Sequence, residues 1–521
     1  MHRTEIIDEI RKQQEWDILV IGGGATGLGT ALDAASRGFR TLLLEQSDFA
    51  KGTSSRSTKL IHGGVRYLQQ GDISLVFEAL HERGLLLQNA PQLVRNLSFV
   101  IPNYDWWDGP FYGMGLKVYD MLAGKYGFGK SGRLTRDETI DVLPTVVRDG
   151  LRGGVIYQDG QFDDSRMAVT IALTAIDYGA VLANYLRVDA LLKNQGLVDG
   201  VRAVDELSGE RFEIRSKVAI NATGVFGNAI LKMDDPDAPD LIRPSQGVHL
   251  VLDREFLPGN HAILVPHTSD GRVLFAVPWH GKLVVGTTDT LVDEVTLEPR
   301  ARNDEIDFIL DNASRYLVRP PRRSDVRSVF AGLRPLAAQQ GSEEQATKEI
   351  SRHHKLLISV SGLLTITGGK WTTYRKMAED AVDRAIDIGG LPERESITRH
   401  LLLHAYDRHV DPDDPLAVYG TDRVAIRRLM PAAQESNISI SDKVFISPAQ
   451  VIWAVRHEMA MTLEDVLSRR TRILLLDARE SLRIAERVAG IMAAELELGS
   501  DWVDEQFEAY EKLAENYILI A

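Results

Sequence analysis

Apolar and polar positions follow a strand–helix–strand order at the start of the chain. Glu5–Glu15 has the spacing of a short amphipathic helix, and the apolar run Trp16–Ile21 predicts a buried strand that glycines terminate. Ala25–Arg37 then has helical character and stops at Gly38, before a second apolar run, Arg40–Glu45. This order predicts a parallel, right-handed β-α-β unit.

Strand patterns dominate the middle of the chain. The pattern first predicts a helix over Asp159–Tyr178 and a strand over Val181–Leu192. Closely spaced strand candidates then predict an antiparallel sheet inserted into the α/β chain: Val248–Leu252, Ala262–Pro266, Val273–Val277 and Leu283–Gly286. Beyond a Gly-Gly-Leu-Pro boundary the pattern becomes helical, over Gln450–Met459, Leu463–Ser468, Ala478–Glu495 and Trp502–Tyr517.

Composition limits the chemistry. The chain has 521 residues and no cysteine, which excludes disulfides, zinc–thiolate sites, iron–sulfur clusters and thiol nucleophiles. Redox chemistry therefore needs a bound cofactor. The net charge is −14, so we expect no nucleic-acid partner. Met1–Trp16 is polar, and no apolar stretch approaches the ~20 residues of a transmembrane helix. We expect a chain that does not span a membrane but is able to lie on one.

A glycine-rich turn connects the first predicted strand to its helix. The residues Gly22-Gly23-Gly24-Ala25-Thr26-Gly27 fit the GxGxxG pattern, in which glycines let a pyrophosphate approach the start of a helix. Glu45 ends the next predicted strand, 18 residues after Gly27, where a carboxylate accepts hydrogen bonds from a ribose. The sequence therefore predicts a dinucleotide site.

Two further turns favour FAD over NAD. An apolar strand runs into the small residues Ala222-Thr223-Gly224, which allow a second close approach of the backbone to the dinucleotide. Gly368-Gly369-Lys370 ends a predicted strand and begins a helix, whose N-terminus would stabilise negative charge on a reduced flavin.

Longer motifs resemble the FAD-dependent glycerol-3-phosphate dehydrogenases. They occupy residues 21–38, 53–68, 285–290, 332–336 and 368–378, and the resemblance extends over essentially the whole chain. It implies oxidation of sn-glycerol 3-phosphate to dihydroxyacetone phosphate, with a hydride passing to FAD and electrons then to membrane quinone. It also implies a cytoplasmic protein bound peripherally to the inner face of the cytoplasmic membrane, and a homodimer, which members often form.

The patterns and the resemblance together predict an α/β fold. A Rossmann-like FAD-binding domain with an inserted antiparallel-sheet substrate domain is expected over residues 1–395, and a helical C-terminal domain over 396–521. The substrate-domain segments are expected at about 70–155 and 240–345. The residues predicted to contact FAD are Gly22, Gly23, Gly24, Ala25, Thr26, Gly27, Glu45, Gln46, Thr53, Ser54, Ser55, Lys59, His62, Gly63, Gly64, Ala222, Thr223, Gly224, Gly332, Gly369, Lys370, Trp371 and Thr372.

A phosphorylated substrate needs cationic, planar donors, which arginine supplies. The resemblance places the phosphate at Arg334 and Arg352, and the remainder of the substrate near Arg66, Tyr67, His249 and Lys370. The C2 hydroxyl must lose a proton as the hydride leaves. His62, His249 and Lys370 stay open as candidates for that role, with Arg66 as electrostatic support, and no metal is expected.

An aromatic tract at Tyr104–Phe128 has two interpretations. It holds 8 aromatic residues in 25, interleaved with lysines, and such a composition suits a membrane interface. Aromatic side chains also dominate soluble cores, and we favour a cap packed on the substrate domain.

Other flavoprotein functions stay open. A glycerol-3-phosphate oxidase would use oxygen, although such oxidases tend to carry an insertion that this chain lacks. An amino-acid oxidase-like enzyme would need a clamp for a carboxylate. A flavoprotein scaffold without activity is disfavoured by the intact Arg334 and Lys370 motifs.

Overall fold

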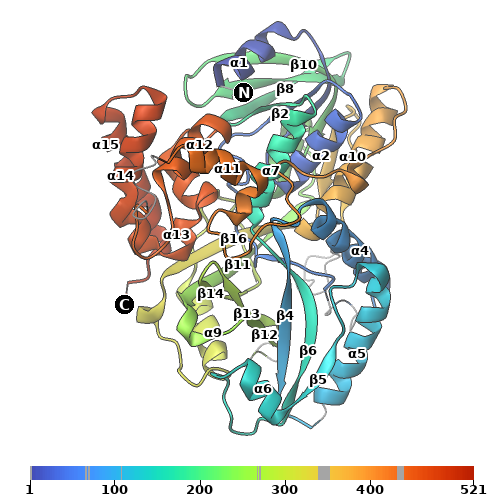
Figure 1. The fold of residues 1–521 in the computed structure, drawn as a ribbon. Helices are drawn as coiled ribbons and strands as arrows, with labels where there is room; N and C mark the ends of the chain where they lie inside the picture. Colours follow the sequence, from blue (N-terminus) through green and yellow to red (C-terminus); the bar gives the residue numbers. More distant parts are fainter. Residues whose placement is uncertain are drawn as a thin grey trace.

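The computed structural model describes residues 3–64, 67, 71–106, 108–266, 268, 271–337, 353–430 and 439–520. Two sheets form its centre, and the C-terminal helices pack along one side of both (Figure 1).

The first sheet carries the predicted β-α-β unit. β1 pairs in parallel with β2 on one side and with β10 on the other, and the four residues of β2 are all buried. The path runs β17-β18-β10-β1-β2-β7, with β8 and β9 extending it beside β10. The strands are β1 Trp16–Ile21, β2 Thr41–Leu44, β7 Val181–Ala183, β8 Leu186–Asn194, β9 Leu197–Asp205, β10 Arg211–Asn221, β17 Lys355–Ile358 and β18 Leu364–Thr367.

Two predicted boundaries near this sheet are wrong. The expected strand Val181–Leu192 is two strands, because Tyr185 has φ +58 and breaks the extended run between β7 and β8. The expected helix Asp159–Tyr178 begins later, as α7 (Asp164–Asp177), because the residues before it complete a strand. The Asp163 side chain caps α7 by accepting from the backbone N–H of Arg166.

Helices bury their apolar faces on the first sheet. α2 packs closely against α10, because Gly29 has no side chain where a Cβ would lie 2.7 Å from the Tyr374 ring. Within the described part of the first 400 residues, the α-helices are α1 Arg3–Lys12, α2 Ala25–Ser36, α4 Ile73–Asn89, α5 Asp108–Ala123, α6 Arg136–Val142, α7 Asp164–Asp177, α8 Gly227–Asp234, α9 Asn303–Ser314 and α10 Tyr374–Gly389.

The second sheet contains the four closely spaced strands that the sequence predicts, now β11 to β14. Its path runs β15-β11-β14-β13-β12-β4-β6-β3, with β16 beside β11 and β5 beside β6. The pairs are antiparallel except that of β4 with β12, which is parallel. The strands are β3 Leu60–Ile61, β4 Val94–Asn103, β5 Gly132–Thr135, β6 Gly153–Phe162, β11 Ile242–Asp253, β12 His261–Val265, β13 Leu274–Trp279, β14 Lys282–Gly286, β15 Thr290–Leu291 and β16 Ser328–Ala337.

Part of the aromatic tract is a packed cap, as favoured, while the side chains of Trp107 and Phe111 lie outside the described part of the chain. Tyr112 and Tyr119 of α5 are buried in one apolar cluster with Phe99 and Tyr157 of the second sheet. Trp106 departs from this pattern, since 64% of its surface is exposed. α5 itself lies on the outside of the molecule beside α4 (Figure 1).

The C-terminal region is helical, as predicted. Its core continues into the second sheet through Trp279, Val284 and Phe330. In the described part of the chain, no helix is both long and apolar enough to cross a membrane. The elements are α11 Arg423–Arg428, α12 Pro448–His457, a π-helical turn Asp465–Arg470, α13 Ile473–Leu476, α14 Ala478–Leu496 and α15 Ser500–Ala514.

His404 joins the C-terminal region to α7. Its ring nitrogens lie 3.0 Å from Asp422 and 2.6 Å from Asp177. These carboxylates, Asp422 first, raise the pKa of His404 to about 9. The imidazolium therefore stabilises the fold fully below the unfolded pKa of about 6.5. This contribution is lost as the pH rises through the folded value.

We expect His404→Gln to lower the urea midpoint at pH 6 more than at pH 10, because the wild-type ion pairs exist only at the lower pH. Urea titrations at both pH values check this. His409→Gln, whose side chain is exposed, should show no such pH dependence. An equal loss at both pH values for His404→Gln would contradict the prediction.

Candidate active site

Two adjoining cavities lie where the carboxyl ends of β1, β2 and β10 approach the second sheet. The first has a volume of about 450 Å³ and the second about 230 Å³. They share four lining residues, Thr58, His62, Tyr67 and Arg334. Because of this shared wall, a ligand in one cavity lies next to a ligand in the other. We call the 450 Å³ cavity the flavin cavity and the 230 Å³ cavity the side recess.

The turn after β1 forms one wall of the flavin cavity. Gly22 has φ +107, and a Cβ there would lie 2.7 Å from the carbonyl oxygen of Ala222. A Cβ on Gly27 would lie 1.9 Å from the carbonyl oxygen of Gly22. Only glycine fits either position. The turn therefore brings the start of α2 to the cavity, where backbone N–H groups suit a pyrophosphate.

Glu45 lies at the end of β2, as the motif requires. Its carboxylate accepts hydrogen bonds from the backbone N–H groups of Gly23 at 2.6 Å and Ser47 at 2.9 Å. Burial raises the pKa of Glu45, and these two bonds oppose that rise. The carboxylate is held in place at the cavity wall beside Gln46.

Most of the residues predicted for the cofactor line the flavin cavity. The exceptions are Gly23, Gly27, Ser55, Lys59, Gly63 and Gly64, of which Gly64 lines the side recess. Lys59 differs most from its expected place. Its Nζ is fully buried and donates to Asp164 Oδ2 and to Ser55 O. The ammonium therefore lies behind the cavity wall instead of facing the cavity.

Two neutral histidines face the cavities. Burial lowers the pKa of His62 to about 4, with Lys370 and Arg83 adding to the shift. Burial also holds the pKa of His249 well below its usual range, and Lys59 and Arg334 add to it. The His249 ring stacks on Phe330. Both imidazoles are uncharged at neutral pH and have a lone pair that can accept a proton.

Lys370 reaches the boundary between the cavities. It lines the flavin cavity at the turn before α10, and its Nζ lies 3.8 Å from the ring centroid of Tyr67. A Cβ on Gly64 would lie 3.4 Å from that Nζ. Gly64, Tyr67 and Lys370 therefore lie close together, as the resemblance of their motifs to the family leads us to expect.

Arg334 and Arg272 supply positive charge to the side recess. Arg334 lies on β16, and its Nη2 donates to Thr287 Oγ1 at 2.9 Å and to Thr288 O at 3.1 Å. Its Nη1 lies 3.4 Å from Asp289 Oδ1. Arg272 also lines the recess. Sequence reasoning missed Arg272 because it stands in a turn without a motif. Arg66 and Arg352 lie outside the described residues.

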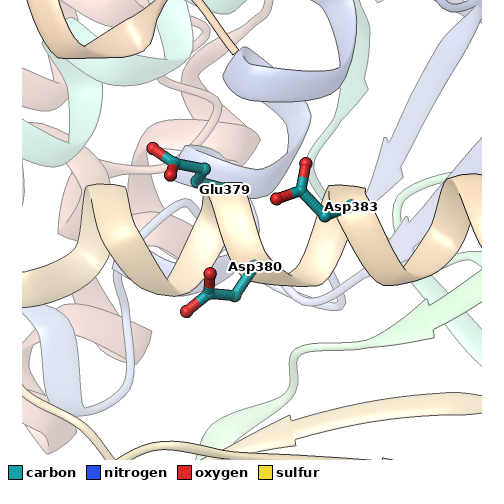
Figure 2. Close-up of side chains that lie close together, drawn as sticks. All are labelled: Glu379, Asp380 and Asp383. Carbon is teal, nitrogen blue, oxygen red and sulfur yellow. The ribbon is translucent and has the colours of Figure 1, made fainter. Parts of the chain in front are cut away.

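Three carboxylates gather on α10 (Figure 2), and none of them lines either cavity. Glu379, Asp380 and Asp383 are close enough to suggest a cation site. Each is already compensated by a cationic or imidazole side chain, which favours an ion-pair network instead of a metal site. The pairs are Arg375 and Lys376 with Glu379, Lys376 and His354 with Asp380, and Arg37 with Asp383.

Comparison with known proteins identifies the family. Residues 17–375 match the FAD dependent oxidoreductase family, and residues 365–505 match the C-terminal domain of alpha-glycerophosphate oxidase. The human mitochondrial glycerol-3-phosphate dehydrogenase is 40% identical over 96% of this chain and 74% of its own length. The Arabidopsis thaliana enzyme SDP6 is 42% identical over 92% of this chain and 82% of its own length.

The chain belongs to the glycerol-3-phosphate dehydrogenase family, within the FAD dependent oxidoreductases.

Solved structures agree with this assignment. A Bacillus halodurans glycerol-3-phosphate dehydrogenase complexed with FAD superposes with a TM-score of 0.79 at 29% identity, over 99% of this chain and 98% of its own. The L-alpha-glycerophosphate oxidase of Mycoplasma pneumoniae, at 17% identity and a TM-score of 0.56, shares the fold over 74% of this chain and 97% of its own.

The cofactor of this family member is FAD, and the residues present fit it. The glycine turn leaves room for a pyrophosphate where any side chain would collide, and Glu45 ends β2, where such a motif has the carboxylate that binds a ribose. The turns at Ala222–Gly224 and Gly368–Thr372 line the same cavity.

We expect Gly22→Ala to weaken FAD binding roughly 10- to 100-fold, because a strained backbone and a displaced Ala222 carbonyl cost about 1–3 kcal/mol. Titration of the apoprotein with FAD, followed by flavin fluorescence, measures this. The matched control is Gly490→Ala, where an added Cβ meets nothing within 4 Å. Wild-type affinity in Gly22→Ala would show that the close approach does not shape the cofactor site.

Proposed function

We propose that this protein oxidises sn-glycerol 3-phosphate at C2 to dihydroxyacetone phosphate and passes the electrons through FAD to quinone. The observation that carries the proposal is the side recess, which brings Arg272 and Arg334 together with the neutral His62 next to the flavin cavity, where His249 also lies. The names of the relatives give the same substrate.

The two arginines bind the phosphate in this proposal. Their guanidinium groups present planar donors that match phosphate oxygens. The bonds of Arg334 to Thr287 and Thr288 fix its plane before substrate arrives, which lowers the entropy cost of binding.

Residues that line the flavin cavity accept the proton and stabilise charge in this proposal. The C2 hydroxyl loses its proton to a neutral imidazole, for which both His62 and His249 are suited by their protonation state. The ammonium of Lys370 stabilises negative charge that develops nearby. Bound FAD supplies the acceptor for the hydride.

We expect sn-glycerol 3-phosphate, added without oxygen to the FAD-loaded protein, to remove the ~450 nm flavin absorbance, and a quinone analogue to restore it. Arg334→Ala should require a roughly 10- to 100-fold higher substrate concentration, since one charged hydrogen bond contributes about 1.5–3 kcal/mol. Stopped-flow absorbance measures both.

Three other results would point elsewhere. Bleaching by an amino acid, but not by glycerol phosphate, would favour an amino-acid oxidase. Stoichiometric peroxide formed in air without quinone would favour an oxidase. An unchanged substrate requirement in Arg334→Ala would remove that residue from phosphate binding.

We also propose that the protein binds an anionic membrane surface through the outer face of α5. Met114, Lys117 and Met121 share that face by their helical spacing, and all three are exposed. Lys125 lies in the short helix Gly124–Tyr126 that directly follows α5. Phe77 of the adjoining α4 is 55% exposed. Apolar side chains with lysines among them are typical of helices that lie in a lipid interface.

The double variant Met114→Glu, Met121→Glu should bind anionic liposomes at least about 10-fold more weakly, because each apolar side chain that enters the interface contributes on the order of 1 kcal/mol. Flotation of the FAD-loaded protein with liposomes measures this. Leu402→Glu with Leu498→Glu places the same charges at exposed apolar positions elsewhere and should bind as the wild type does. Equal loss in both would assign the effect to net charge.

The division into domains stays part of the proposal. The helical elements after residue 396 and the second-sheet segments within 70–155 and 240–345 support it.

A further inference from the structure

A buried carboxylate at the start of α7 joins the C-terminal region to the loop that lines the flavin cavity. The Asp164 side chain is fully buried. It accepts from Ser57 N at 3.0 Å, Ser57 Oγ at 2.7 Å, Lys59 Nζ at 2.7 Å and Arg472 Nη2 at 2.7 Å. Two cations and two polar groups thus compensate one buried charge.

Arg472 comes from the C-terminal region but reaches this loop. Its side chain is 3% exposed, and Nη2 also donates to Ser55 O at 2.9 Å. Arg472 and Lys59 both have φ +65, a left-handed conformation that residues with side chains seldom adopt. Such a backbone persists where surrounding contacts determine it. The shared bonds to Asp164 are such contacts.

The loop that these bonds hold forms part of the flavin cavity. Ser54 Oγ accepts from the N–H of Ala25 at 2.9 Å, at the start of α2, and Trp371 Nε1 donates to Ser54 O at 2.8 Å. Thr58 stands between the two residues bound to Asp164, and its Oγ1 lies 2.9 Å from His249 Nε2. A shift of the loop would therefore move both the cofactor wall and a candidate catalytic imidazole.

Residues 469–472 of the C-terminal region, which we call the C-terminal turn, also hold the other end of the loop. Arg470 donates from Nη1 and Nη2 to the two oxygens of Asp48 at 2.7 and 2.9 Å, and both side chains are fully buried. Arg469 also pairs with Asp48. Contacts at both ends of residues 48–59 make the C-terminal turn a rigid backing for the cavity wall.

We propose that Arg472 is a positioning residue for the flavin site: through Asp164 and Ser55 it fixes residues 55–59, and with them the cofactor wall and the Thr58–His249 contact. Its effect on substrate oxidation rests on the proposed function. Its effect on FAD binding and on the loop does not.

The test compares Arg472→Met and Arg472→Lys with Arg479→Met, a matched control in the same region. Arg479 donates to the carbonyls of Val326 and Leu519 and does not touch the loop. Arg472→Met should bind FAD roughly 10-fold more weakly, because the cavity wall loses its pre-set geometry. Arg472→Lys should lie between it and the wild type, and Arg479→Met should match the wild type. Fluorescence titration of each apoprotein measures this.

Hydrogen–deuterium exchange distinguishes positioning of the loop from general stabilisation of the C-terminal region. In Arg472→Met, amides of residues 53–61 should exchange faster, while those of α14 should stay as protected as in Arg479→Met. Flavin reduction by glycerol 3-phosphate should slow in kcat more than KM rises, because Arg472 lies outside the side recess.

Equal loss of affinity in Arg472→Met and Arg479→Met would overturn the inference, because it would show general weakening of the C-terminal region. Wild-type affinity and exchange in Arg472→Met would also overturn it. If Arg472→Met does not fold, the same comparison with Arg472→Lys decides. A wild-type flavin that glycerol 3-phosphate fails to reduce would refute the proposed function, and the FAD and exchange results would still decide the role of Arg472.

Discussion

The close approach of two backbone turns, after β1 and after β10, is the constraint on which the cofactor site depends. The parallel strands bring their carboxyl ends to one edge of the sheet, and the turns meet there within contact distance of Gly22 and Ala222. A side chain at Gly22 would separate them. Because the backbones touch, the start of α2 and the Ala222–Gly224 turn form one continuous wall for FAD.

The second sheet supplies an imidazole and a guanidinium to the flavin cavity. It carries His249 on β11 and Arg334 on β16, two neighbouring strands, so a neutral imidazole and a guanidinium line the same cavity. Burial is what keeps the imidazole neutral, while the guanidinium keeps its charge because its basicity is far higher. The same burial therefore leaves the imidazole neutral and the guanidinium charged, as the proposed roles of proton acceptor and phosphate ligand require.

The C-terminal region combines an acidic surface with an arginine-rich interior edge. Between Leu401 and Ala521 there are 13 basic and 21 acidic residues, yet Arg469, Arg470 and Arg472 are turned inward and buried. Their partners Asp48 and Asp164 belong to the flavin-binding part. The net charge of this region therefore reflects its solvent-exposed residues. It does not indicate the charge of the side chains that contact the cofactor loop.

The amino-acid sequence by itself determined the local elements whose periodicity is strong: the β-α-β unit, the strands β11 to β14 and the C-terminal helices. It also determined the glycine turn and its acidic partner, because these depend on residues close together in the chain. The long strands β4, β6 and β16 were not predicted, since their burial depends on neighbours far away in sequence. For the same reason the positions of Lys59, Arg272 and Arg472 were decided only by the tertiary structure. Ion pairs and cavities join residues hundreds of positions apart, and no local pattern records which charge meets which.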